Sequence, residues 1–441
     1  MNREFFKSLL LGVLVVASIA MTWNIWFYKM DYKNYKGPSN SANSVAIAGS
    51  YKMNEVIRPT LVIAHAQNGT SGETASAQIR EMYQAFQRVS FTNIVPSSKK
   101  SLSRKSGTVS YEIVFPSPLI QGTLNKLFHF HSGNGQIPQS AQIDRIEIYQ
   151  AAGTGTLMAS FRSGANQEQF SAKVSGTSLS RLSANYSEDR SSPYRLQRLK
   201  NYTAYLPAGY TKIRSQLMYF QKTPINAFIP ILFTDPKNVF HDRGKTAFND
   251  GTSQLEATNN IMQYVNTGIT NNSSGLSDPI IHSYEFIDNF KAWTNNFIYD
   301  GYSDASDQQK TVTFRMMFGD YMVFNTEYYP NPFLTTMELT WENQDLTSFN
   351  RTLLTFSRID ATNAVVLDPG NMVLQKLRQA SVPVNQIEDM VIGYKVANPM
   401  SGNNTSLMAS PDWFYKINGK WYSETSALLS RQPNSQRENL Q

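Results

Sequence analysis

The feature that most constrains this 441-residue chain is an uncharged apolar run near its N-terminus. Residues 8–27 read SLLLGVLVVASIAMTWNIWF and contain no Asp, Glu, Lys or Arg. At about 1.5 Å per helical residue, such a run spans roughly 30 Å, the thickness of the hydrocarbon core of a bilayer. We therefore predict one transmembrane helix within residues 1–28 that anchors the rest of the chain.

The flanks of this run carry residues that favour a membrane interface. The interface anchors expected at the inner end and then at the outer end are Lys7, Trp23, Trp26, Phe27 and Tyr28. Basic residues lie on both sides, so the direction is inferred from size: few residues precede the run and a long body follows it. We expect a cytoplasmic N-terminus and an extracytoplasmic body in the cell membrane. A cleaved signal peptide is the alternative, because Ser18 and Ala20 have the spacing of a cleavage site, although apolar residues continue past them.

One face of the predicted helix is a candidate contact surface for another helix. It contains a pair of small residues four positions apart, a spacing that lets two membrane helices approach closely. The candidate partner-contact residues are Ser8, Gly12, Val15, Ile19 and Thr22.

Composition favours a folded body and excludes several kinds of chemistry. Hydrophobic residues make up 41% of the chain and aromatic residues 12%, which is enough for packed cores. No cysteine is present, so disulfides, thiolate nucleophiles and thiolate metal sites are excluded.

The net charge of +7 does not by itself indicate nucleic-acid binding, because the basic residues are scattered along the chain. The local clusters are Lys99, Lys100, Arg104 and Lys105, followed by Arg190, Arg195, Arg198 and Lys200. Both lie in serine-rich stretches and are interpreted as solvated surface, with an anionic envelope polymer or lipid headgroup as the alternative ligand. No nucleic-acid partner is expected for an extracytoplasmic body.

The pattern of strands, helices and turns predicts an α+β fold with three extracytoplasmic domains of antiparallel sheets and packed helices. After a polar linker at 29–44, these are an N-terminal domain at 45–197, a middle domain at 198–305, a C-terminal domain at 306–430 and a polar tail at 431–441. The last two domains each place one helix against antiparallel strands.

Helix signals are local and specific. Thr70 and Glu73 have the spacing of a capping box before a helix whose buried face carries Ile79, Met82, Tyr83 and Phe86. Asp278 and Pro279 predict the start of a second helix, with an aromatic stripe at Phe286, Phe290, Trp293 and Phe297. A third helix is predicted from about residue 369 to before Pro383.

Strand and turn signals fill the segments between these helices. Residues 225–236 and 253–267 are both predicted to be strand-like. Gly319-Asp320 and Asn418-Gly419 are predicted hairpin turns.

A search for catalytic and metal-binding motifs yields only weak candidates. His129 and His131 have metal-ligand spacing on a strand but no evident third ligand, and His241, Asp242 and Arg243 are explained as well by a turn. Nucleophile-elbow, zinc-protease, P-loop and dinucleotide-binding motifs do not occur in the sequence. We predict no catalytic, cofactor-binding or metal residues and a binding or regulatory role, while a glycosidase with two carboxylates distant in sequence stays open.

Several stretches resemble the YycH family of membrane-anchored regulators. They are TWNIWF (22–27), RPTLVIAH (58–65), ILFTDPKNV (231–239), DGTSQLEATNNIMQYVN (250–266), VTFRMMFGDYMVFN (312–325) and PDWFYKINGKWY (411–422). The similarity covers nearly the whole chain in the same order.

The resemblance implies a non-enzymatic regulator of the YycG/YycF (WalK/WalR) two-component system, which controls cell-wall homeostasis in Gram-positive bacteria. It also implies association with the sensor histidine kinase YycG/WalK and with a YycI-like membrane protein, mainly through the membrane helix. No catalytic residues and no cofactor are implied. The rival hypothesis is an envelope-polymer binding or processing protein for which the helix, held in membrane lipid, is only a tether.

Overall fold

The computed structural model describes Ser18 and residues 46–96, 103–131, 135–164, 167–242, 246–268, 278–304, 309–326, 331–397 and 405–429. The chain forms two compact units, Met1–Ser44 and Val45–Gln441, and every helix and strand discussed below belongs to the second. Within the described residues, no helix has the length and apolar character needed to cross a bilayer. Apart from Ser18, the predicted anchor lies outside this range, together with its interface anchors and its contact face, and these stay predictions.

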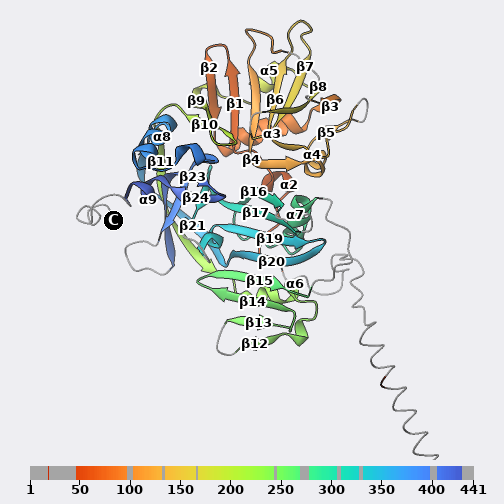
Figure 1. The fold of residues 1–441 in the computed structure, drawn as a ribbon, viewed down its shortest axis with the longest axis vertical. Helices are drawn as coiled ribbons and strands as arrows, with labels where there is room; N and C mark the ends of the chain where they lie inside the picture. The colour runs from red at the N-terminus through yellow and green to blue at the C-terminus, as the bar shows by residue number, and fades with distance from the viewer. Residues whose placement is uncertain are drawn as a thin grey trace, which may run out of the picture. The chain divides into compact units, whose positions relative to one another are not determined.

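The N-terminal half of the second unit forms a ten-stranded sheet (Figure 1). In spatial order its strands are β10 (Thr203–Pro207), β9 (Ser192–Arg198), β2 (Gly69–Glu73), β1 (Leu61–Ala66), β4 (Ser110–Ile120), β6 (Gln142–Gln150), β7 (Leu157–Arg162), β8 (Glu168–Ser175), β3 (Ser90–Pro96) and β5 (His129–Phe130). The helices of this half are α2 (Met53–Val56), α3 (Ser76–Gln87), α4 (Gln121–Leu127) and α5 (Leu179–Ser183).

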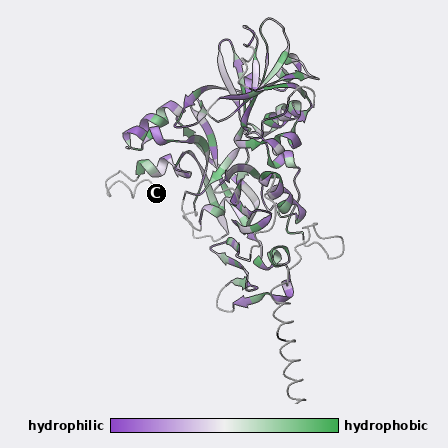
Figure 2. Ribbon diagram, turned by 45° about the vertical axis from the view of Figure 1, so that its right-hand side comes forward, coloured by the Kyte–Doolittle hydropathy of each residue, from purple (hydrophilic) through white to green (hydrophobic). Residues whose placement is uncertain are grey.

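The first sheet is held by an apolar core that the sequence anticipates. Helix α3 buries Ile79, Met82, Tyr83 and Phe86, so the predicted helical face is confirmed. These residues belong to the same core cluster as Ile113 of β4 and Ile146 of β6. Hydrophobic and hydrophilic residues intermix along the strands, as expected where one face of a strand is more apolar than the other (Figure 2).

The predicted capping box before α3 is wrong. Thr70 and Glu73 lie in strand β2, where they pair with β1, and the helix begins at Ser76. The Ser76 N–H instead donates to the carboxylate of Asp320, 2.8 Å away and 244 residues further along the chain. A cap provided by a distant residue leaves no local sequence signal.

The C-terminal half forms a fourteen-stranded sheet. Along the main path its strands are β12 (Phe240–Asp242), β13 (Ala247–Asn249), β14 (Ser253–Thr258), β15 (Ile261–Asn266), β20 (Asp345–Thr352), β19 (Thr336–Glu342), β17 (Gln309–Phe318), β18 (Tyr321–Phe324), β22 (Asp389–Ala397), β23 (Ser406–Ile417), β11 (Thr211–Lys222) and β21 (Leu354–Leu367). Strand β16 (Phe297–Asp304) pairs with β17, and β24 (Lys420–Ser423) pairs with β23. The predicted hairpins at Gly319-Asp320 and Asn418-Gly419 are confirmed.

The helices of this half are α6 (Ile229–Leu232), α7 (Pro279–Asn289), α8 (Gly370–Gln379) and α9 (Glu424–Leu429). Helix α8 confirms the prediction from residue 369. The aromatic stripe predicted for α7 is correct only at Phe286: the helix ends at Asn289, Phe290 is its C-cap, Trp293 follows it, and Phe297 opens β16. Residues 225–236 are short helical turns instead of strand, because Pro224 and Pro230 favour a helical start over a sheet ladder.

Polar contacts join the two sheets through their helices and loops. Both oxygens of Asp278 accept from the Thr123 hydroxyl, and the same Asp278 caps α7 by accepting from two backbone N–H groups. The Tyr299 hydroxyl donates to the Pro118 carbonyl at 2.8 Å. Along the chain, the last strand of the first sheet ends at Pro207 and the first strand of the second begins at Thr211. The predicted boundary between the middle and C-terminal domains, at residue 305, falls between two strands of the second sheet. The three-domain division stays a prediction.

We predict that Asp278→Ala lowers the free energy of unfolding by about 2 kcal/mol, because it removes a helix cap and a buried contact between the sheets. Urea denaturation of the purified protein measures the change. Asp235→Ala is the matched control, since Asp235 caps only a short, exposed turn; an equal loss for both variants would contradict the role of Asp278 in joining the sheets.

Candidate functional site: a buried ion network

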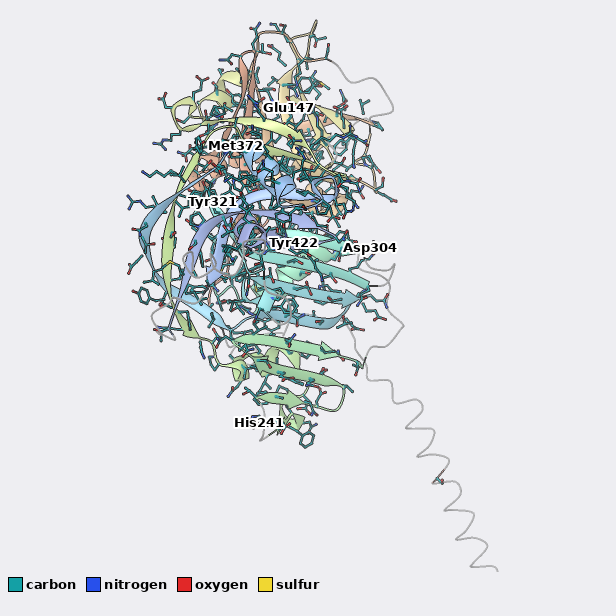
Figure 3. All side chains as sticks on the ribbon, turned by 60° about the vertical axis from the view of Figure 1, so that its left-hand side comes forward. Glu147, His241, Asp304, Tyr321, Met372 and Tyr422 are labelled. Carbon is teal, nitrogen blue, oxygen red and sulfur yellow. The ribbon has the colours of Figure 1, made fainter. Side chains whose placement is uncertain are left out.

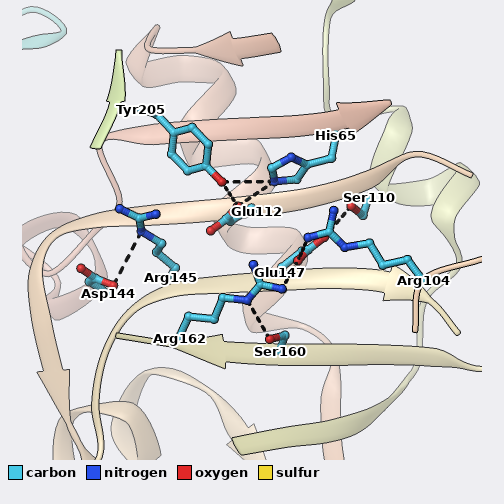
Figure 4. Close-up of polar contacts among 10 residues, drawn as sticks. All are labelled: His65, Arg104, Ser110, Glu112, Asp144, Arg145, Glu147, Ser160, Arg162 and Tyr205. Atoms are coloured by element: carbon cyan, nitrogen blue, oxygen red, sulfur yellow. Dashed lines mark hydrogen bonds and ion pairs between the residues drawn. The ribbon is translucent and has the colours of Figure 1, made fainter. Parts of the chain in front are cut away.

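Two buried glutamates face each other on neighbouring strands of the first sheet (Figure 4). Glu112 of β4 pairs in register with Glu147 of β6, and both are 0% exposed. Their neighbours Ile113 and Ile146, which also pair, join the apolar core, so the two carboxylates occupy the opposite face of the sheet. Like charges at directly opposed positions destabilise a sheet unless cations compensate them.

Glu147 is compensated by two arginines and a hydroxyl. Arg104 donates to its carboxylate at 2.6 Å, Arg162 lies 3.0 Å away, and the Ser110 hydroxyl donates at 2.5 Å. Arg162 also donates to Ser160, so the strand pairs β4–β6 and β6–β7 share one network. Arg104 was expected to be a solvated surface residue. Its side chain is indeed 40% exposed, but it also pairs with the buried Glu147, which the sequence did not indicate.

Glu112 is compensated by His65 and Tyr205. The His65 Nε2 and the Tyr205 hydroxyl each lie 2.7 Å from the same carboxylate oxygen. Burial raises the pKa of Glu112, but the hydrogen bond and the charge of His65, helped by Arg145, outweigh burial and hold the pKa below its usual value. Glu112 is therefore an anion in the folded protein.

The edge of the sheet curls over this face. Strand β10 is separated from β4 by β9, β2 and β1, yet its Tyr205 reaches Glu112. The guanidinium of Arg145 on β6 donates to the carbonyl of Thr203 on β10. The rings of Tyr202 and Tyr205 lie 5.3 Å and 5.1 Å from the Arg145 guanidinium carbon, within the range of cation–π attraction. Strand β10 is thus held over the buried charges.

The far end of the network reaches the second sheet. Burial raises the pKa of Asp144, which lies beside Arg145, to about 7. Burial likewise raises the pKa of Asp389 on β22 to about 6. The Lys200 N–H donates to the carbonyl of Ile387, and its side chain pairs with Glu388. The segment that closes the network therefore also attaches to β22.

This geometry favours a structural role, an electrostatic link between strands, over catalysis. A pair of catalytic carboxylates has to reach a substrate, whereas Glu112 and Glu147 are both fully buried and already bound to basic and hydroxyl groups. What the network does is hold β10, and with it the connection to the second sheet, against β4 and β6.

The other sequence candidates do not assemble into a site. His129 and His131 are exposed, and no group of three potential metal-ligating residues occurs among the described positions. His241 stacks on Phe248, while Arg243, Lys99 and Lys100 lie outside the described residues. Arg195 and Arg198 lie exposed on β9. The predicted sites therefore do not include the buried network.

Comparison with known proteins places the chain in context. The model of the YycH protein N-terminal domain matches residues 4–191, and that of the C-terminal domain matches residues 201–430. The "Two-component system WalR/WalK regulatory protein YycH" of Bacillus subtilis is 20% identical over 467 aligned positions, covering 98% of both chains.

A solved structure shows the same fold. The crystal structure of YycH from Bacillus subtilis superposes with a TM-score of 0.69 at 16% identity, over 86% of this chain and 98% of that one. An uncharacterized protein from Eubacterium rectale reaches a TM-score of only 0.30, over 48% of this chain.

The fold and the network define a two-sheet α+β protein whose buried charges connect strands instead of opening onto a substrate. The chain belongs to the YycH family. The α+β fold class and the family resemblance drawn from the sequence are confirmed.

We predict that Tyr205→Phe destabilises the protein by about 1–2 kcal/mol, because it removes a hydrogen bond to a buried carboxylate while keeping the ring. Chemical denaturation measures the change. Tyr210→Phe serves as control, since Tyr210 is 66% exposed and its hydroxyl contacts only the sulfur of the exposed Met372, 3.9 Å away. Equal stability of Tyr205→Phe and wild type would show that the hydroxyl does not contribute to holding β10.

We also predict a pH effect at Asp144. Because its pKa rises from 3.8 to about 7 on folding, the folded state keeps a proton that the unfolded chain loses, and stability falls as pH rises between these values. Asp144→Asn should remove this loss, up to about 1.4 kcal/mol per pH unit. Urea midpoints at pH 4.5 and 7.5 test it, with Glu81→Gln on the exposed side of α3 as control; identical slopes in Asp144→Asn and wild type would refute it.

Proposed function

We propose that this protein is a non-enzymatic, membrane-anchored regulator of a WalR/WalK-type two-component system. The observation that carries the proposal is the match of both YycH domain models across residues 4–191 and 201–430. The Bacillus subtilis relative, covered over 98% of its length, is named as a regulatory protein of that system. The enclosed carboxylates of the first sheet support a non-enzymatic role, because they are bound to other groups of the same chain.

The anchor is the proposed route to the kinase. In this proposal residues 8–27, which carry no charge, form one helix in the cell membrane with the body on the extracytoplasmic side. A helix that contacts kinase helices differently in two arrangements shifts their equilibrium by the difference in contact free energy. The Ser8, Gly12, Val15, Ile19 and Thr22 face is the proposed contact, because small residues allow close approach.

The body is proposed to join a YycI-like membrane protein outside the cell. The buried ion network at β10 supports this role, since it connects the first sheet to the second and lets the body act as one piece. In this proposal, such a body positions the anchor and catalyses no reaction. Cofactors have no part in this function.

We predict that replacing residues 8–27 with an unrelated membrane helix of equal length abolishes the effect of the protein on kinase output. A reporter gene under control of the response regulator measures output, and immunoblotting confirms equal protein levels. The matched control is Leu10→Ile, which keeps the apolar length and lies off the proposed face. Unchanged regulation after the helix swap would overturn the proposed route.

The rival function, an envelope-polymer protein for which the helix is only a tether, predicts the opposite result. Regulation would then survive the swap, and the body would bind or process wall polymer as well without its anchor as with it. Comparing the helix-swapped protein with the body lacking its anchor therefore separates the two hypotheses.

A further inference from the structure

An amphipathic surface lies where β10 leads into β11 beside helix α8. Three of the exposed large apolar residues of the described chain gather here: Tyr210 is 66% exposed, Val366 59% and Met372 36%. The Tyr210 hydroxyl lies 3.9 Å from the sulfur of Met372, and Val366 pairs in register with Lys212. Figure 3 shows Met372 at this position on the body.

Basic side chains alternate with these apolar ones. Lys212 and Arg214 lie at a spacing of two on one face of β11, and Tyr210 directly precedes the strand; all three are exposed. Arg195 lies opposite Leu206 on β10, and Leu206 lies against the start of α8 at Gly370. Within the described residues, none of these three cations has an acidic partner. Asp368, just before the start of α8, forms an ion pair with Lys376.

We propose that this surface, formed by Arg195, Tyr210, Lys212, Arg214, Val366 and Met372, docks the body onto an anionic lipid bilayer. A bilayer interface accepts both components, because apolar and aromatic side chains enter the headgroup layer while lysine and arginine stay with the phosphates. An anionic wall polymer would satisfy the cations but leave Tyr210, Val366 and Met372 exposed to water. The apolar members therefore favour lipid.

The proposal rests on the membrane location given under Proposed function. The linker at 29–44 is short enough to keep the body within reach of the bilayer, since 16 residues extend to at most roughly 55 Å. At that range the bilayer is present at high effective concentration, so a surface of few residues suffices. Docking would restrict how the body moves relative to the anchor.

The absence of cysteine from the sequence allows a direct test by single labelling. Gly209→Cys places a fluorophore beside the surface without altering it, because a Cβ at Gly209 meets no atom within 4 Å. Phe240→Cys is the control site, being 70% exposed on β12 at the other end of the body from α8 (Figure 1, Figure 3). The full chain is reconstituted in phosphatidylcholine vesicles with and without phosphatidylglycerol, and a lipid-borne quencher reports contact.

We predict quenching at position 209 but not at 240, only in vesicles with phosphatidylglycerol, and loss of the effect at high salt. Lys212→Gln should lower the ratio of docked to undocked protein about fivefold, and Tyr210→Ser should lower it by a similar factor. Lys222→Gln, at the other exposed end of β11, is the matched control and should leave the ratio unchanged.

Equal quenching at 209 and 240, or quenching that ignores phosphatidylglycerol and Lys212→Gln, would overturn the proposal. Binding of wall polymer that depends on Lys212 but not on Tyr210, without lipid quenching, would overturn it in favour of a polymer site. Flotation of the full chain with neutral vesicles at high salt tests the anchor separately. If flotation fails, vesicles added to the labelled chain still test the surface, so failure of the anchor and of docking are distinguishable.

Discussion

The structure of the first sheet depends on two glutamates that face each other across β4 and β6. Two buried anions at adjacent positions are tolerable only when cations surround them, since an uncompensated buried charge costs several kcal/mol. Arg104, Arg162 and His65 arrive from different segments to supply that compensation. The network therefore favours the observed strand order, because in it Glu112 and Glu147 each meet their partners.

The same constraint extends to the connection between the sheets. Tyr205 completes the environment of Glu112, and Arg145 holds the carbonyl of Thr203, so β10 lies over the network instead of continuing outward as a flat edge. A curled edge leaves fewer backbone groups free for pairing with another chain. It also directs the chain into β11, whose start carries the proposed lipid-docking surface. The buried charges and that surface are thus linked by the short backbone segment from Tyr205 to Tyr210.

The sequence predicts the fold better than it predicts the network. Helical apolar patterns lead to α3 and α8, because the burial of one helix face follows from a local spacing of apolar residues. The start of α3 is different: its cap is Asp320, a residue 244 positions away, while Thr70 and Glu73 match a capping motif that β-pairing overrides. The predicted end of α7 is wrong for a related reason. Trp293 and Phe297 continue the helical spacing of apolar residues, but they are buried by tertiary packing beyond the end of the helix.

The sequence does carry a signal for the buried network: a charged residue inside an otherwise apolar strand. The apolar periodicity alone does not show whether that charge is buried. Glu112 is the single charged residue of SYEIVF, and Glu147 follows Arg145 at a spacing of two within DRIEIY. Such a charge indicates either an exposed face or a buried ion pair, and only the register of β4 against β6 distinguishes them. The partners could not be chosen from sequence, because Arg104 binds Glu147 and Tyr205 binds Glu112 from segments separated by about a hundred residues. Buried charge inside a strand is therefore best taken as evidence that another segment must cover it, and in this chain that segment is β10.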